Sequence, residues 1–226
     1  MSKSHKDAIR PRRYDLFPTT LMTFEHDEAA LNAEIERHFL TDPRYSRADQ
    51  AEQSDSLNLM DLAAEVPAFA RLQEMFQEAL GVYARETGWT GAFDLAMQMF
   101  PNVAPARHYV PSHNHVAHIV AVYYVATPPF EDRPLIDHGS SMSDYWRPEE
   151  GVLILQDPRF NASLMGGWQH YARIYPRPGL MIMFPAFLWH EVTPHFSNAA
   201  RLSVAANFTL EPRGAAFQKK LAFRVD

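Results

Sequence analysis

The sequence predicts a mainly β protein with helices at its N-terminus, the β part forming an antiparallel sandwich or barrel such as a jelly roll. Two segments with helical spacing of apolar residues precede residue 92. From Ala92 onward, short apolar runs alternate with Pro, Gly and Asn, and no helical pattern separates them. A chain of 226 residues most simply makes one large or two small domains, here with a helical part up to residue 91 and a β part from residue 92.

Two amphipathic helices are expected in the first half. The segment Asp27–Leu40 carries an apolar stripe, and a second helix begins near Pro67 and continues to about Glu86. Gly88 is suited to ending that second helix, and the polar stretch 41–56 between the two helices reads as a loop. The apolar stripe of the first helix consists of Leu31, Ile35, Phe39 and Leu40.

The β part is expected to contain seven or eight strands. The turn signal Pro176–Gly179 and a long polar loop, 131–150, separate some of them. A loop of that length is often a lid or a substrate loop, which makes Tyr145, Trp146 and Arg147 candidates for substrate contact. The expected strands are Phe93–Phe100, Ala117–Val125, Val152–Leu155, Tyr171–Tyr175, Leu180–Phe184, Leu188–Val192 and Arg201–Thr209.

Composition narrows the classes of function. With 226 residues, 46% apolar residues and 12% aromatic residues, the chain can bury a sizeable core. The net charge of −6, without a long block of either sign, argues against nucleic-acid binding. Because the chain has no cysteine, any metal must be held by nitrogen and oxygen ligands.

The sequence favours a cytoplasmic protein without membrane segments. The stretch 1–13 is charged and lacks the apolar core of a signal peptide. The longest apolar stretch, Gly179–Trp189, is interrupted by Pro185 and is shorter than the ~20 residues of a membrane helix.

Three histidines form a candidate metal site. His113 and His115 are two residues apart in an extended segment, so their side chains point to the same side. His190 follows an aromatic β segment, where a solitary buried imidazole needs a partner. Three imidazoles suit iron, copper or zinc. The competing interpretation is that the pair is a chance occurrence and that His190 is hydrogen-bonded to backbone.

Arg201 opens the last strand and is a candidate anion site. Alternation places Arg201, Ser203 and Asn207 on one face of that strand. Facing the inside of a barrel, the guanidinium needs an anionic partner, such as a carboxylate. Facing solvent, it would be an ordinary surface charge, and alternation alone does not separate the two cases.

The order of these motifs resembles a family of 2-oxoglutarate/Fe(II)-dependent oxygenases. Nearly the whole chain takes part, and Phe-Pro-x(4)-His followed by Arg-x-Ser is the most specific element. The similarity rests on Leu16–Thr20, His113-x-His115, the strand with Tyr123-Tyr124, Asp157-Pro158-Arg159, Gly179–Pro185, His190 and Arg201-x-Ser203…Asn207.

The resemblance implies a double-stranded β-helix, a jelly-roll or cupin-like core with helices on one sheet. It implies a single domain over residues 1–226, in which a helical part (1–91) packs on the β core (92–226). It implies Fe(II) held by His113, His115 and His190, which leaves positions for 2-oxoglutarate and O₂. The far carboxylate of 2-oxoglutarate would meet Arg201 and Ser203, with Asn207 also on the cosubstrate side. The implied activity is that of a dioxygenase, most simply a hydroxylase, which converts 2-oxoglutarate to succinate while oxidising a small-molecule or peptide substrate.

Several assignments around this site stay open. The superfamily usually has a carboxylate where this chain has His115, and a bulge would let His118 compete as the second ligand. Strand parity with the histidines turns Tyr123 toward the cosubstrate and Tyr124 outward under the helices. Phe184, Phe187 and Trp189 are expected to line the barrel around the metal. For His108 and His195 the surface is the favoured position, and a position just behind the metal ligands is the alternative; Asp157 and Arg159 are expected to form a local ion pair.

Two rival functions fit parts of the pattern. A three-histidine, cupin-like metal enzyme that does not use 2-oxoglutarate explains His115 but leaves Arg201-x-Ser203 without a role. A non-catalytic jelly-roll binding module would have structural histidines and no stoichiometric metal.

Overall fold

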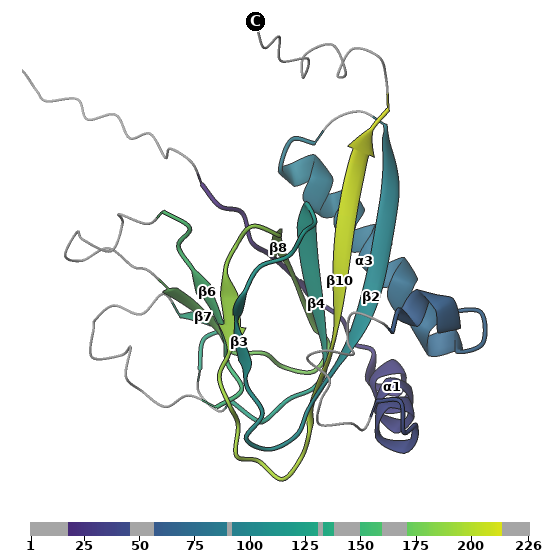
Figure 1. Cartoon of the computed structure of the whole chain (residues 1–226), viewed down its shortest axis with the longest axis vertical. Helices are drawn as coiled ribbons and strands as arrows, with labels where there is room; N and C mark the ends of the chain where they lie inside the picture. Colours follow the sequence, from purple (N-terminus) through teal and green to yellow (C-terminus); the bar gives the residue numbers. More distant parts are fainter. Residues whose placement is uncertain are drawn as a thin grey trace, which may run out of the picture.

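The residues that the structure describes form two five-stranded antiparallel sheets, which confirms the expected mainly β, jelly-roll class (Figure 1). This computed structural model describes residues 18–45, 57–89, 92–130, 133–137, 150–159 and 171–213. The strands are β1 (Met22–Glu25), β2 (Phe93–Ala104), β3 (Val110–His113), β4 (Ile119–Ala126), β5 (Ile136–Asp137), β6 (Leu153–Gln156), β7 (Tyr171–Ile174), β8 (Leu180–Pro185), β9 (His190–Val192) and β10 (Arg201–Pro212).

The chain crosses repeatedly between the two sheets, as in a jelly roll. The first sheet has the order β1-β8-β4-β10-β2 and the second has the order β3-β9-β6-β7-β5. The long strands β2 and β10 pair over their full lengths, with Arg201 opposite Ala104 and Asn207 opposite Gln98. This register carries one face of β10 and one face of β2 into the space between the sheets.

Helices cover the outer face of the first sheet (Figure 1). They are α1 (Ala29–Thr41) and α3 (Pro67–Glu86), with a short 3-10 helix, η2 (Leu59–Leu62), beside them. The apolar stripe of α3 packs on alternate residues of β4 and β10; Phe76 and Phe208, for example, meet edge to face at 6.3 Å. No described helix has the length and apolarity to cross a membrane.

A second apolar core lies between the two sheets. It joins the inward residues of β4 and β8 to those of β6 and β7, and Val122, Tyr124, Leu155, Ile182 and Phe184 belong to it. Residues of β4 therefore alternate between the helix-covered core and the inter-sheet core, although both sets are apolar. This explains why the run Ile119–Ala126 showed no polar alternation in the sequence.

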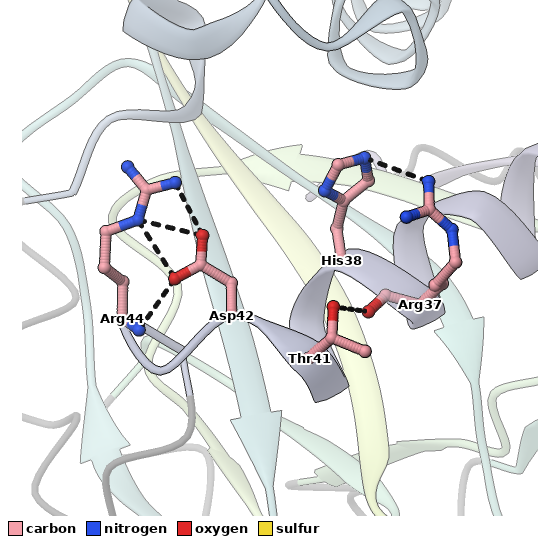
Figure 2. Close-up of polar contacts among 5 residues, drawn as sticks. All are labelled: Arg37, His38, Thr41, Asp42 and Arg44. Atoms are coloured by element: carbon pink, nitrogen blue, oxygen red, sulfur yellow. Dashed lines mark hydrogen bonds and ion pairs between the residues drawn. The ribbon is translucent and has the colours of Figure 1, made fainter.

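The helix α1 ends at Thr41, and polar side chains interact at this end of it, just before Pro43 (Figure 2). The Thr41 hydroxyl donates to the Arg37 carbonyl at 2.7 Å. Asp42 is extended, as expected for a residue before proline, and its carboxylate pairs with Arg44 at 2.6 Å. Leu40, placed on the buried stripe by the sequence, is exposed, so that stripe is narrower than expected.

The predicted helices and strands are present with shifts of a few residues at their ends, and three short strands were missed. These are β1, β3 and β5, each of two to four residues. The turn at Pro176–Gly179 occurs as predicted. Gly179 has a φ of +84°, and a Cβ there would lie 2.2 Å from the His26 carbonyl oxygen, so glycine is required.

Candidate functional site

Three imidazoles converge between the end of β3 and the start of β9. His113 ends β3 and lies opposite His190 in the ladder, while His115 lies in the loop that follows. One ring nitrogen from each lies within 4.8 Å of the others, and the Nε2 atoms of His115 and His190 are 3.3 Å apart. Two nitrogens that bind one metal at about 2.1 Å have a similar separation.

Backbone carbonyls fix the orientation of two of these rings. His113 Nδ1 lies 2.8 Å from the Pro111 oxygen, and His190 Nδ1 lies 2.9 Å from the Leu188 oxygen. Because a carbonyl only accepts, Nδ1 carries the hydrogen in both rings and Nε2 keeps its lone pair. Burial lowers the pKa of His190 to about 4, so this ring is neutral at neutral pH. Both features suit metal ligation.

The histidines lie on a cavity of about 580 Å³ between the sheets. That volume is typical of a small-molecule site. The inward residues of β2, β4 and β10 form one wall, and residues 108–111 and 113–116 form another. Those inward residues are Gln98, Phe100, Asn102, Ala104, Val120, Val122, Tyr124, Arg201, Ser203, Ala205 and Asn207.

Arg201 is only 3% exposed, and it lines this cavity rather than facing solvent. No carboxylate of the described residues pairs with it, and its Nε has no hydrogen-bond partner among them. The guanidinium carbon lies 5.2 Å from the centre of the Tyr124 ring, in cation–π contact. Burial lowers the pKa of Arg201, and the nearby Tyr124 acts in the opposite direction. A buried cation without a counter-charge is the arrangement expected of an anion site.

Ser203 and Asn207 face the cavity together with Arg201, as alternation along β10 suggested. Ser203 is buried, and the Asn207 Oδ1 is buried without a hydrogen-bond partner in the described part of the chain. Unpaired buried polar atoms cost free energy unless a ligand or water meets them. Three such atoms on one cavity wall, on Tyr124, Arg201 and Asn207, indicate a polar ligand there.

The orientations expected for the two tyrosines were wrong. Tyr123 faces α1, where its hydroxyl donates to Asn32 Oδ1 at 2.7 Å, and Tyr124 faces the cavity beside Arg201. Parity failed because β3 ends at His113, and residues 114–118 are not in strand before β4 begins in the other sheet. The cavity tyrosine is therefore Tyr124, and burial raises its pKa to about 12.

Three other histidines lie outside the cluster of imidazoles. His118 does not join the cluster; its Nδ1 accepts the Leu210 N–H at 2.9 Å, and its ring lies 5.8 Å from Trp89. His195 is 1% exposed rather than at the surface, and His108 lines the cavity. Burial lowers the pKa of His108, and His195 and Arg201 lower it further.

Two further expectations around the metal cluster had different outcomes. Phe184 is buried, and its ring lies edge-on to His190 at 5.2 Å, but Phe187 and Trp189 are 55% and 47% exposed and do not line the cavity. They belong to the turn that leads into β9, whose residues His190 and Val192 do line the cavity. The expected ion pair between Asp157 and Arg159 is present at 2.6 Å. The substrate-contact candidates at 145–147 lie outside the described residues.

Comparisons with known proteins agree with this geometry. Residues 98–207 match the family described as putative 2OG-Fe(II) oxygenase. A comparison with curated protein sequences gives no match. Among solved structures, AviO1 from Streptomyces viridochromogenes Tue57 is similar with a TM-score of 0.52 and 12% identity, covering 84% of this chain and 90% of AviO1.

A second similar structure is HygX from Streptomyces hygroscopicus, with a TM-score of 0.51 and 12% identity over 84% of this chain and 82% of HygX. HygX was solved with iron bound and also with nickel and 2-oxoglutarate bound. At this identity the likeness shows the fold, whereas the family match covers the strands that carry the histidines and Arg201. Residues 98–207, just under half of the chain, therefore resemble the family of putative 2OG-Fe(II) oxygenases.

Proposed function

We propose that this protein is a non-haem Fe(II) and 2-oxoglutarate-dependent dioxygenase, and specifically a hydroxylase of a small-molecule or peptide substrate. The observation that carries the proposal is a single cavity with two ligand-binding features, a cluster of possible metal ligands and a buried cation. Three imidazoles converge at one place, and a buried guanidinium without a carboxylate partner among the described residues lies elsewhere on the wall. A metal bound by the imidazoles and chelated by a dicarboxylate, whose second carboxylate pairs with the guanidinium, would engage both features at once.

The metal would be held by His113, His115 and His190. The donor set fits a metal ion. In His113 and His190, Nδ1–H donates to a backbone carbonyl, so Nε2 carries the lone pair that can bind the metal. His115 Nε2 lies 3.3 Å from His190 Nε2. All three ligands are neutral, so the site contributes no negative charge of its own to a divalent cation. An anionic cosubstrate would supply that charge.

The cosubstrate would lie along the inward face of β10. Arg201 and Ser203 would bind the carboxylate far from the metal, and Asn207 would meet the end near the metal. The Tyr124 hydroxyl, which has no partner in the described part of the chain, would donate to the same far carboxylate in place of the Tyr123 first expected there. These residues are in place before the ligand arrives, so binding requires little ordering.

When bound, Fe(II) supplies the activation of O₂ that is coupled to oxidative decarboxylation of 2-oxoglutarate to succinate and CO₂. The chain's own residues orient the reactants and exclude water. Val120, Val122 and Phe184 are buried apolar residues between the sheets, and they shield the reacting end from bulk solvent. We further propose that residues 1–226 form one domain, since α1 and α3 share a continuous apolar core with the first sheet.

The two rival functions explain less of the cavity. A three-histidine enzyme that does not use 2-oxoglutarate leaves Arg201 buried without a counter-charge, at a cost of several kcal/mol by general estimates. A non-catalytic binding module gives no reason for three converging imidazoles. In two of them Nδ1–H donates to a backbone carbonyl, as is common for metal-binding histidines.

The test is an anaerobic titration of the Fe(II)-loaded protein with 2-oxoglutarate, followed by the visible charge-transfer band of an iron-chelated keto acid. We expect a saturable band that is lost in His190→Ala and strongly weakened in Arg201→Leu. His118→Ala is the matched control, because His118 lies apart from the cluster. Iron binding without the band would favour the rival metal enzyme, and no metal binding would favour the binding module.

A further inference from the structure

Two buried nitrogen atoms of opposite hydrogen-bonding capacity lie at the Arg201 end of the cavity. Arg201 Nε and His195 Nδ1 are both buried, and neither has a hydrogen-bond partner among the described residues. The arginine Nε–H can only donate. His195 Nε2 lies 2.9 Å from the Ala104 carbonyl oxygen, so it carries the hydrogen, and Nδ1 of the neutral ring can only accept.

Two independent features place these side chains together. A Cβ built on Gly151 would lie 3.5 Å from His195 Cβ and 3.6 Å from Arg201 Cδ, so both side chains flank the same small space. The carbonyl that holds His195 belongs to Ala104, which is the residue opposite Arg201 in the β2–β10 ladder. Gly151 itself has a φ of +69° and donates to the carbonyls of Thr193 and Pro194, which fixes the segment before His195.

A carboxylate ligand could pair with only some of the unpartnered atoms at this end of the cavity. Its oxygens accept, so they can pair with Arg201, Ser203 and Tyr124 but not with the lone pair on His195. That lone pair needs a donor, and Arg201, whose Nε–H is also unpartnered in the described residues, flanks the same space at Gly151. A guanidinium that donates Nε–H to His195 also keeps both Nη atoms for a bidentate carboxylate.

We propose that His195 is a positioning residue: when the cosubstrate binds, His195 Nδ1 accepts the Nε–H of Arg201 and both Nη atoms turn toward the far carboxylate. This role rests on the proposed function, because it requires Arg201 to bind that carboxylate. His195 acts through Arg201 and does not touch the metal. It therefore affects only ligands that reach Arg201.

Calorimetric titration of the anaerobic Fe(II)-loaded protein with two ligands tests this role. 2-Oxoglutarate reaches Arg201, whereas oxalate chelates the metal and has no distant carboxylate. We expect His195→Leu to weaken 2-oxoglutarate binding about tenfold while oxalate binding stays unchanged. His195→Asn offers an acceptor oxygen close to the position of Nδ1 and should restore most of the affinity. His118→Leu, which changes a histidine apart from the cavity, should affect neither ligand.

Three results would overturn the proposal. His195→Leu could bind 2-oxoglutarate as tightly as the wild type, or it could lose affinity for both ligands equally, as a purely structural role predicts. His195→Asn could also fail to restore affinity despite a wild-type melting temperature. A wild-type protein that binds oxalate but not 2-oxoglutarate would instead overturn the proposed function, and this role with it.

Discussion

The two faces of the first sheet each bury a tyrosine of β4, and only one of the two hydroxyl groups is hydrogen-bonded within the described residues. Tyr123 and Tyr124 are neighbours on β4, and both are fully buried. On the helix-covered face, the Tyr123 hydroxyl bonds to Asn32. On the cavity face, the hydroxyl of Tyr124 has no partner within the described part of the chain, and the same is true of Arg201 Nε and Asn207 Oδ1.

This difference separates a structural face from a binding face. A buried polar group that a protein uses for stability is normally paired within the protein. Groups left unpaired on one cavity wall lower the stability of the ligand-free protein and are recovered when a ligand pairs with them. Substitutions on the helix-covered face should therefore change stability, and substitutions on the cavity face should change binding.

The largest effect is expected for the metal cluster. His190→Ala removes one of three converging nitrogens, and we expect the loss of measurable Fe(II) binding by anaerobic equilibrium dialysis, a drop of more than about a hundredfold. His118→Ala should bind Fe(II) as the wild type does. Retained binding in His190→Ala would show that these imidazoles do not form the metal site.

Arg201→Leu is the next largest. It removes the only described permanent charge that lines the cavity, and we expect 2-oxoglutarate affinity to fall about a hundredfold, or about 3 kcal/mol. Because the leucine removes an unpaired buried charge, the free energy of unfolding without ligand should not fall. Urea denaturation of the ligand-free protein measures the second quantity. A clear loss of stability would mean that Arg201 has a structural partner.

The sequence predicted the histidines, the arginine and the fold class because each depends on local spacing. Alternation within β10 placed Arg201, Ser203 and Asn207 on one face correctly, because that strand is continuous. Parity carried from His113 to Tyr123 failed, because residues 114–118 interrupt the strand and the chain changes sheets. The buried position of His195 was also missed, since it depends on contacts with Ala104 and Gly151 that are distant in sequence.

A smaller contrast concerns adjacent residues of β10. Val204 faces the helices and Ser203 faces the cavity. Val204→Ala should lower the free energy of unfolding by about 2 kcal/mol through the cavity that it leaves, with unchanged 2-oxoglutarate affinity in the folded protein. Ser203→Ala should weaken 2-oxoglutarate binding severalfold and leave stability nearly unchanged. Denaturant titration and calorimetry of both variants measure the two quantities, and the same pattern in both would remove the distinction between the faces.

The two tyrosines give the finest test, since the same atom is removed from each face. Tyr123→Phe breaks the hydrogen bond to Asn32 and leaves its acceptor unpaired, so we expect a loss of about 1 kcal/mol in the free energy of unfolding and no change in 2-oxoglutarate affinity. Tyr124→Phe removes a hydroxyl that has no partner in the described residues, so the ligand-free protein should be as stable as the wild type or slightly more stable. Its 2-oxoglutarate affinity should nevertheless fall severalfold, because the carboxylate loses a donor. Equal losses of stability in the two variants would mean that the Tyr124 hydroxyl is paired in solution, and the cavity face would then be structural at this position.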